Sequence, residues 1–346
     1  MVSIYEYSRD GLAERLISEP RYRVDQVWRG LWDEALCLEE ITTIPKVLRT
    51  RLEAEFPSAL EVANDVTSDR GATRKWVFRL HDGATIETVL MNYDDRVTVC
   101  VSSQAGCAMN CSFCATGQAG FNRQLSVGEV VEQVMFATRE AAPRRLSNVV
   151  FMGMGEPLAN YDVTVETVRR LHEYRGLSAR HLTVSTVGVA PAIERLADEG
   201  LALTLAVSLH AANDATRDAL VPLNRRYPLA RLHEACERWI TTTSRRLSFE
   251  WALIDGVNDT DEAVEELASY AGSLRAHVNL IPLNPTPGYL VRGSSPERVR
   301  AFRDGLVARG VNATVRNTRG RSIDAACGQL ANVTNAKRRS IKVRTS

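Results

Sequence analysis

The chain has 346 residues, of which 45% are apolar and 25% charged, and its 43 Lys and Arg residues nearly balance 42 Asp and Glu residues. This composition is typical of a globular protein and excludes an acidic disordered chain, a collagen-like chain and a small disulfide-stabilised scaffold. The length predicts two domains, or one large α/β barrel with an appended region.

Residues 1–60 are predicted to form a helical accessory domain. The first twenty residues carry charges throughout and lack the apolar stretch of a secretory signal, and no run of about 20 apolar residues could cross a bilayer. We therefore expect a cytoplasmic protein with reduced thiols and no membrane contact, and the odd number of cysteines, seven, agrees with this. Segments 23–36 and 44–56 have the three- and four-residue apolar spacing of amphipathic helices.

Residues 61–95 are predicted to form a β-hairpin extension. Segments 74–80 and 85–90 are rich in β-forming residues, and His81, Asp82 and Gly83 between them supply a turn.

Residues 96–335 alternate short apolar runs with helical stretches. The predicted strands are 97–102, 148–151, 181–185, 203–208, 247–253 and 278–281. Predicted helices begin at Ser126, after Asp162 and near Pro191, and others cover 229–240, 260–273 and 296–309. Six β-α units in series imply a parallel α/β sheet with helices on its faces. The periodicity leaves open a doubly wound sheet or a barrel, and in both ligands bind at the C-terminal ends of the strands.

The C-terminal region is strongly basic. Residues 292–346 contain 13 Lys and Arg against three acidic residues, so this region carries a charge of +10 and the rest of the chain −9. One interpretation is a solvated face followed by a basic tail at 336–346, and the other is a contact surface for a nucleic-acid phosphate backbone.

Three cysteines follow the first strand of the β-α series. Cys107, Cys111 and Cys114 have the spacing C-x3-C-x2-C, which allows three thiolates to surround one metal centre from a single loop. A structural zinc site would need a fourth ligand, and no second Cys or His pair follows. Three ligands suit a 4Fe–4S cluster with one iron left open for a small molecule. This spacing resembles the radical S-adenosylmethionine (SAM) superfamily, which implies that the cluster reduces bound SAM to a 5′-deoxyadenosyl radical.

Polar residues stand at the ends of the later predicted strands. They are Gly155 and Glu156 in the sequence Gly-Glu-Pro, Ser185, the run Ser208, Leu209 and His210, and Asn284. Each of them alone could be a turn residue or a helix cap. The Gly-Glu-Pro segment resembles the superfamily motif that binds the amino group of SAM.

Segments 100–120, 153–160, 279–288 and 318–330 together resemble the RlmN/Cfr radical SAM RNA methyltransferases, and the resemblance extends from about residue 22 to 333. It implies a partial (β/α)6 radical SAM barrel with the N-terminal helical domain and the hairpin as additions. Cys107, Cys111 and Cys114 would bind the cluster, and the seven strand-end residues named above would bind SAM. Of the other cysteines, Cys37 and Cys236 are expected to be buried in the core.

The resemblance also implies roles for three residues outside this pocket. Cys327 would take a methyl group from one SAM molecule, and the radical formed from a second SAM would abstract hydrogen from that methyl group. The resulting carbon radical would add to carbon 2 of an adenine, and Glu87 would accept the ring proton. After loss of one electron, the Cys100 thiolate would attack the Cys327 sulfur and leave a transient disulfide.

The substrates implied are an adenosine in the peptidyl-transferase region of 23S rRNA and the adenosine beside the tRNA anticodon, each accessible in a loop or flipped out of its stack. Reduced ferredoxin or flavodoxin would supply electrons, and a monomer is the expectation for the oligomeric state. Arg321 stands where many members have an acidic residue. The alternatives are a Cfr-like carbon-8 methyltransferase that confers antibiotic resistance, an iron–sulfur redox protein without methyltransferase activity, and a zinc-containing RNA-binding protein.

Overall fold

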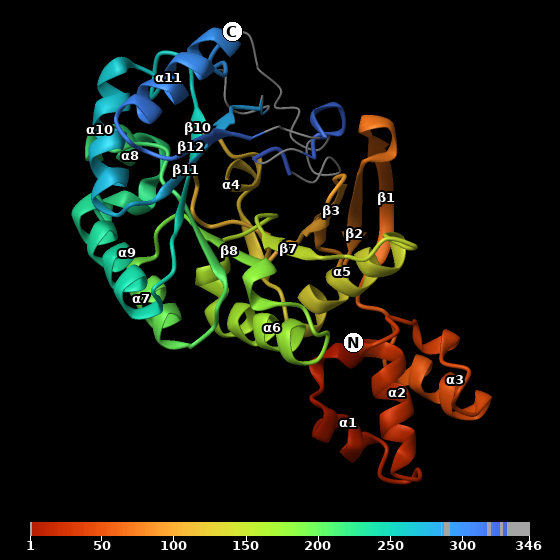
Figure 1. Cartoon of the computed structure of the whole chain (residues 1–346). Helices are drawn as coiled ribbons and strands as arrows, with labels where there is room; N and C mark the ends of the chain where they lie inside the picture. Colours follow the sequence, from red (N-terminus) through yellow and green to blue (C-terminus); the bar gives the residue numbers. More distant parts are fainter. Residues whose placement is uncertain (1, 285, 287–290, 317–319, 326–327, 331–346) are drawn as a thin grey trace, which may run out of the picture.

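The computed structural model describes residues 2–284, 286, 291–316, 320–325 and 328–330. Ten strands of these residues form one mixed sheet in the order β1-β2-β3-β4-β7-β8-β9-β10-β11-β12 (Figure 1). The strands from β4 to β12 run parallel to one another, and β1 to β4 pair antiparallel. In the described chain the sheet therefore has two edges, at β1 and β12, which agrees with an open, partial barrel.

The parallel part confirms the predicted β-α series. Its strands are β4 (Val97–Cys100), β7 (Asn148–Phe151), β8 (Leu182–Thr186), β9 (Thr204–Ser208), β10 (Ser248–Leu253), β11 (His277–Pro282) and β12 (Ala313–Val315). The helices are α5 (Val127–Glu140), α6 (Tyr161–Glu173), α7 (Ala190–Asp198), α8 (Asp214–Leu220), α9 (Leu229–Thr243), α10 (Asp261–Ser273) and α11 (Pro296–Ala308). Helices α6, α7, α9, α10 and α11 lie along the outer side of the curved sheet, and the short helix α4 (Ala115–Ala119) lies on its inner side (Figure 1).

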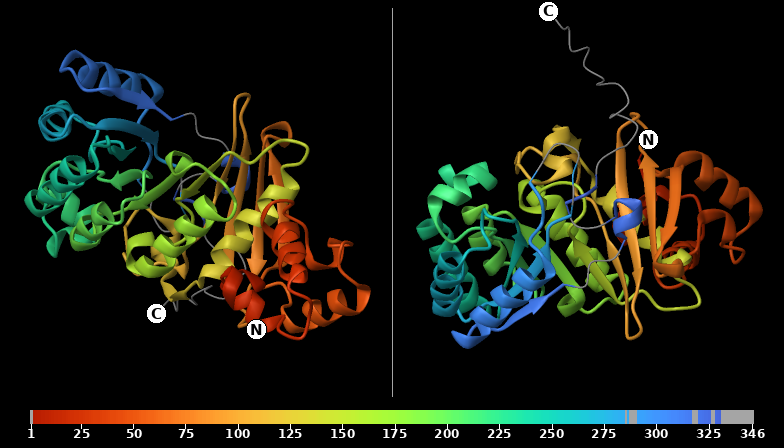
Figure 2. Two further views of the ribbon diagram at one scale, coloured as in Figure 1. Left: turned by 60° about the horizontal axis from the view of Figure 1, so that its bottom comes forward. Right: turned by 90° about the horizontal axis from the view of Figure 1, so that it is seen from above.

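Helix α5 packs against the antiparallel strands with one face and against the N-terminal helices with another. Phe136 contacts Trp76 and Phe78 edge to face, with ring centroids 5.2 and 5.0 Å apart, and so joins α5 to the antiparallel strands. Val131 and Met135 are fully buried in a second core formed with the N-terminal helices. These are α1 (Arg9–Arg15), α2 (Tyr22–Trp32) and α3 (Lys46–Glu55), which lie at one end of the molecule (Figure 2).

The hairpin expectation is confirmed and extended. Strands β2 (Thr73–Arg79) and β3 (Thr85–Asn92) pair across the predicted turn. Strand β1 (Glu61–Ser68) adds an edge strand that the sequence did not predict, because its residues are mostly exposed and show no apolar alternation. Two further short strands, β5 (Gln104–Gly106) and β6 (Phe121–Gln124), pair on either side of α4.

Two isolated cysteines differ in burial. Cys236 is fully buried in the main core, as expected, whereas Cys37 is only partly buried, so the expectation for Cys37 is wrong. Cys37 precedes a single helical turn at residues 38–40 on the N-terminal helical part and does not belong to its core. No helix among the described residues is long and apolar enough to span a bilayer.

Candidate active site

A cavity of about 1020 Å³, its open mouth included, lies inside the curve of the sheet. It is lined by the loop that carries the three cysteines and by the C-terminal ends of β7 to β11. Of the predicted site residues, the following line it: Cys107, Cys111, Cys114, Gly155, Glu156, Ser185, Ser208, His210 and Asn284. Residues from six predicted β-α units therefore meet at one place, as expected for the C-terminal ends of parallel strands.

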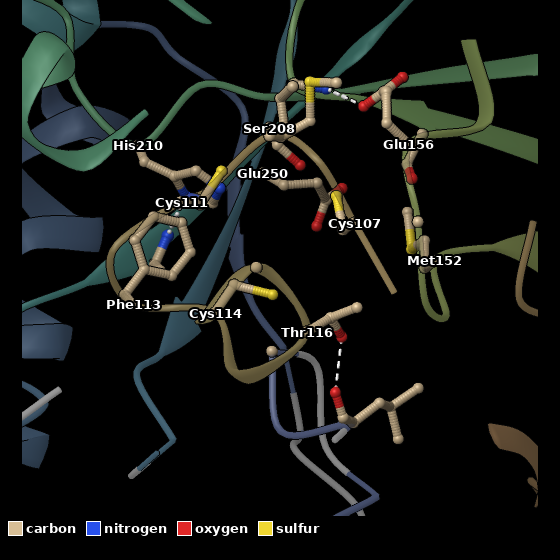
Figure 3. Close-up of a pocket in the computed structure, with 18 of the residues that line it drawn as sticks. Cys107, Cys111, Phe113, Cys114, Thr116, Met152, Glu156, Ser208, His210 and Glu250 are labelled. Carbon is tan, nitrogen blue, oxygen red and sulfur yellow. Dashed lines mark hydrogen bonds between the residues drawn. The ribbon is translucent and has the colours of Figure 1, made fainter. Parts of the chain in front are cut away.

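The three cysteines project into the cavity from the loop between β5 and α4 (Figure 3). Cys107 and Cys111 are buried and Cys114 is partly buried. Burial raises the pKa of the Cys107 thiol to about 12 and that of Cys111 well above its ordinary value, so both stay protonated unless a cation replaces the proton. Within the described ranges no three Cys, His, Asp or Glu side chains are placed to share a single metal ion. In an iron–sulfur cube each cysteine binds its own iron atom, so three thiols around one cavity, two buried and one partly buried, fit such a cluster.

Glycine is required beside the carboxylate of this cavity. Gly155 has φ +106°, and a Cβ at this position would lie 2.6 Å from the Cβ of Gln104. The close approach lets the Gln104 side-chain oxygen accept the Glu156 backbone N–H at 2.8 Å. The Glu156 carboxylate in turn accepts the backbone N–H of Val187 at 2.8 Å and that of Leu158 at 3.0 Å. Burial raises the pKa of Glu156 from its ordinary 4.5 to about 7, and an ammonium group in the cavity would offset this cost.

His210 is held as a neutral donor at the edge of the cavity. It is buried, and burial lowers its pKa to about 3. Its Nδ1 accepts the backbone N–H of Ala252 at 2.9 Å, so the proton of the neutral ring resides on Nε2. The ring of Phe113, from the cysteine loop, packs edge-on at 4.7 Å and fixes its orientation (Figure 3).

Leu209 is the one described residue of the expected SAM set that does not line the cavity. Its side chain is fully buried in the main core. Its backbone links two neighbours, because its N–H donates to the carbonyl of Glu250 at 3.0 Å and its carbonyl accepts from Arg217 at 3.0 Å.

Two buried charged residues, one lining the cavity and one behind it, were not identified from the sequence. Glu250 lies on β10 and lines the cavity, where its carboxylate accepts the Ser248 hydroxyl and the Asn279 amide, both at 2.8 Å. A signal was present, since Glu250 is a charged residue between Phe249 and Trp251 in a predicted strand. Arg217 is 1% exposed and donates to the carbonyls of Leu209 and Val187, which follow β9 and β8. An arginine on a short helix offers no such signal.

Cys100 and Glu87 lie outside the cavity-lining set but on one face of the antiparallel strands. Lys75 on β2 pairs with Val89 on β3, and Val89 pairs with Cys100 on β4, so these three side chains form a row. Glu87 stands two residues from Val89 and shares its face. The opposite face carries Trp76, which packs against α5. Glu87 and Cys100 therefore face away from α5, and both are buried.

Cys327 lies outside the described residues, but its neighbours in the sequence are described. Gly328, which follows it, lines the cavity, and the Gly328 carbonyl accepts the Ala115 N–H at 2.8 Å. Leu330 also lines the cavity, and its carbonyl accepts the Thr116 hydroxyl at 2.6 Å.

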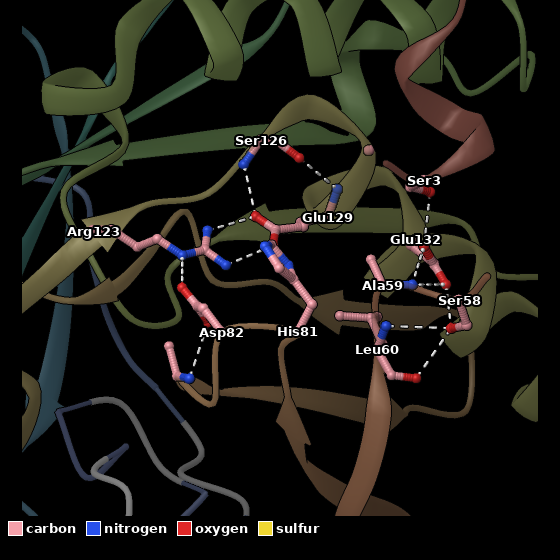
Figure 4. A network of polar contacts seen from close by, with 12 residues as sticks. Ser3, Ser58, Ala59, Leu60, His81, Asp82, Arg123, Ser126, Glu129 and Glu132 are labelled. Carbon is pink, nitrogen blue, oxygen red and sulfur yellow. Dashed lines mark hydrogen bonds and ion pairs between the residues drawn. The ribbon is translucent and has the colours of Figure 1, made fainter. Parts of the chain in front are cut away.

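A polar network ties the cysteine loop region to the rest of the molecule (Figure 4). Arg123 on β6 forms a two-fold contact with Glu129 of α5, at 2.7 and 2.8 Å, and also contacts Asp82 in the turn between β2 and β3. Arg123 holds the pKa of Asp82 below its ordinary value. On the next turn of α5, Glu132 accepts the Ser3 hydroxyl at 2.8 Å and the Ala59 N–H at 3.1 Å, which anchors the N-terminal segment.

Residues 101–271 match the family model described as the radical SAM superfamily. The chain is 53% identical over 332 residues to "Probable dual-specificity RNA methyltransferase RlmN" of Parafrankia sp. (strain EAN1pec), which covers 90% of this chain and 86% of that protein. It is 50% identical to the protein of the same name from Chloroflexus aurantiacus, over 95% of this chain and 92% of that protein.

A solved structure agrees with these relatives. The crystal structure of a radical SAM methyltransferase from Sphaerobacter thermophilus superposes with a TM-score of 0.92 at 50% identity, over 95% of this chain and 99% of that one. The likeness extends over the N-terminal helices, the antiparallel strands and the parallel sheet, because nearly the whole chain is covered. The relatives are methyltransferases, which favours the enzyme over the redox-protein and zinc-protein alternatives.

Proposed function

Because this chain belongs to the RlmN family of radical SAM RNA methyltransferases, we propose that it methylates carbon 2 of an adenosine in the peptidyl-transferase region of 23S rRNA and of the adenosine beside the tRNA anticodon. The relatives compared above carry the RlmN name, which supports carbon 2 over the Cfr-like carbon-8 reaction. The observation that carries the proposal is that Gly328, next to Cys327, lines the same cavity as the three loop cysteines.

The family uses a 4Fe–4S cluster and SAM. In this chain Cys107, Cys111 and Cys114 would hold the cluster. Glu156 would accept hydrogen bonds from the amino group of SAM, supported by its burial and its position beside Gly155. The remaining SAM contacts would come from Ser185, Ser208, Leu209, His210 and Asn284, with Leu209 contributing through its backbone. When bound, the cluster and SAM supply a transferable methyl group and a 5′-deoxyadenosyl radical.

The protein's own residues would carry the methyl group and resolve the adduct. Cys327 would accept a methyl group on sulfur and become bonded through that carbon to the adenine. The Glu87 carboxylate would take the ring proton, while the electron pair of the C–H bond stays in the ring. The adduct would also lose one electron to the iron–sulfur cluster. The Cys100 thiolate would then attack the Cys327 sulfur, so a disulfide forms and the sulfur–carbon bond breaks. The electron pair of that bond would stay on the carbon, which takes up a proton and becomes the methyl group of the product. The shared face of Glu87 and Cys100 supports this pairing of roles.

RNA would be gripped by the basic C-terminal region and by the N-terminal helices. Of the basic region, residues 317–319, 326–327 and 331–346, with the tail at 336–346, lie outside the described residues. We retain the division into residues 1–60, 61–95, 96–335 and 336–346 as a proposal. Reduced ferredoxin or flavodoxin as electron donor, a monomeric state and a cytoplasmic location belong to the same proposal.

Mass spectrometry of 23S rRNA and tRNA after reaction with the reconstituted enzyme tests the assignment. Methylated adenosine at carbon 2 in either RNA is expected, and its absence from both would refute it. Cys327→Ala should keep the cluster and transfer no methyl group, whereas Cys100→Ala should accumulate protein crosslinked to RNA. Normal methylation by either variant would refute the role of that cysteine.

A further inference from the structure

Lys75 forms a buried ion pair on the face of the antiparallel strands that carries Cys100. Its Nζ lies 3.1 Å from the Oε2 of Glu87, and the two side chains are 4% and 0% exposed. Removing two charges from water costs several kcal/mol per ion, so a buried pair by itself is weak evidence for a stabilising role. The burial of this pair is therefore better explained by a role of Lys75 other than stabilising the fold.

The same ammonium group contacts a distant part of the chain. Lys75 Nζ donates to the backbone carbonyl of Asp324 at 3.1 Å, across 249 positions of sequence. Asp324 stands three residues before Cys327. Lys75 thus contacts both the carboxylate proposed to accept the substrate proton and the segment that leads to the methyl-carrying cysteine.

A second contact holds this segment on the same strands. The Asp69 carboxylate, in the turn between β1 and β2, accepts the Gly320 N–H at 2.9 Å and the Thr73 hydroxyl at 2.6 Å. Gly320 has φ +72°, and a Cβ there would lie 2.7 Å from the Cβ of Ala325, so the segment turns tightly against the strands.

The residues after Cys327 are held by a different part of the chain. As described above, the carbonyls of Gly328 and Leu330 accept hydrogen bonds from Ala115 and Thr116, which begin the helix after the cysteine loop. The described residues before positions 326 and 327 therefore contact strand β2 and the turn before it, whereas those after these positions contact the start of α4. Lys75 is the contact that also touches Glu87.

We propose that Lys75 is a positioning residue that fixes the Glu87 carboxylate relative to the segment leading to Cys327, so that Glu87 can remove the substrate proton. This rests on the proposed function, in which Glu87 accepts that proton. In the step, the ring C–H bond breaks, its electron pair remains in the ring and the proton moves to a Glu87 oxygen. The Lys75 ammonium compensates the charge of the Glu87 carboxylate before the transfer, so this buried base does not depend on water to balance its charge.

Three variants of the full-length, cluster-containing protein test the role. Lys75→Met removes both contacts, and Lys75→Gln keeps a donor for the Asp324 carbonyl but no charge for Glu87. Lys75→Arg is the matched control, because a guanidinium can serve both partners. Four quantities are measured with SAM, reductant and substrate RNA. They are methylation of Cys327 by peptide mass spectrometry, 5′-deoxyadenosine, methylated RNA, and RNA-crosslinked protein on a denaturing gel.

For Lys75→Met and Lys75→Gln we expect normal methylation of Cys327 and continued release of 5′-deoxyadenosine. The yield of methylated RNA should fall about tenfold or more, because the Glu87 base is no longer held in position for proton removal. Protein crosslinked to RNA should accumulate, as expected for Glu87→Gln. Lys75→Arg should retain most of the activity. If Lys75→Met does not fold, Lys75→Gln still allows the comparison with the wild-type enzyme. Its amide can keep the hydrogen bond to the Asp324 carbonyl, which favours folding.

Two results would overturn the positioning role. One is wild-type yields of methylated RNA from both neutral variants. The other is a parallel loss of Cys327 methylation, SAM cleavage and RNA product, which indicates general damage to the site. Failure of the proposed function is distinguishable, because the wild-type enzyme itself would then form no methylated RNA, or Glu87→Gln would be fully active.

Discussion

The affinity for SAM is expected to depend on the ionisation of Glu156. The ionised carboxylate attracts the SAM ammonium by its charge and accepts its hydrogen bond on either oxygen, whereas the protonated carboxyl group carries no charge. With a pKa of about 7, the ionised fraction is about 9% at pH 6 and about 50% at pH 7. The amino group of SAM stays protonated throughout this range, since α-amino groups titrate near pH 7.7–8.0. The apparent dissociation constant should therefore fall about fivefold between pH 6 and pH 7.

The sign of the effect on stability is opposite to that on binding. Because the folded-state pKa is raised above the unfolded value, the buried neutral carboxyl favours folding fully below about pH 4.5, and this contribution is lost as the pH rises through about 7. Binding of an ammonium group recovers the cost. SAM should therefore raise the melting temperature more at pH 7 than at pH 6.

Anaerobic equilibrium dialysis of radiolabelled SAM against the cluster-containing protein measures the binding, and the cluster absorbance shows that the cluster stays intact. Glu156→Gln is the matched control, since its amide cannot titrate and its weaker binding should be independent of pH. This dependence on Glu156 ionisation would be refuted if the dissociation constant of the wild-type protein were the same at pH 6 and pH 7 within error. An equal pH dependence in Glu156→Gln would also refute it.

Three further outcomes follow from buried contacts. Gly155→Ala should lose SAM binding while the protein still folds, because a Cβ there collides with a neighbouring side chain at 2.6 Å; unchanged binding by dialysis would contradict this. Lys75→Met should lower the free energy of unfolding by about 3–5 kcal/mol, because Glu87 loses its buried counter-charge, and adding Glu87→Gln should recover most of it in urea denaturation. A double variant no more stable than Lys75→Met would argue against a charge effect. Glu132→Ala should release the N-terminal segment to limited proteolysis without changing 5′-deoxyadenosine formation, and equal cleavage rates of variant and wild type would contradict the anchoring role.

The main β-α series was predictable because its signals are local. Buried parallel strands are short apolar runs, and β7 begins and ends where the run at 148–151 predicted. The edge strands were not predictable for the opposite reason. Strand β1 is mostly exposed and is held by pairing with β2, and β12 has only three residues. Their strand conformation depends on a neighbour and not on their own composition.

The cysteine motif alone predicts a metal centre on one loop, because Cys107, Cys111 and Cys114 lie within eight residues. The sequence also places Glu156 in a Gly-Glu-Pro turn after an apolar strand. The contacts of Lys75 with Glu87 and the Asp324 carbonyl, and those of Arg217 with the residues after two strands, are visible only in the folded molecule. The spacing of residues along the chain predicts only which side chains lie close together within the same loop or helix. A contact across 249 positions forms because the strands pair and because buried polar groups need hydrogen-bond partners.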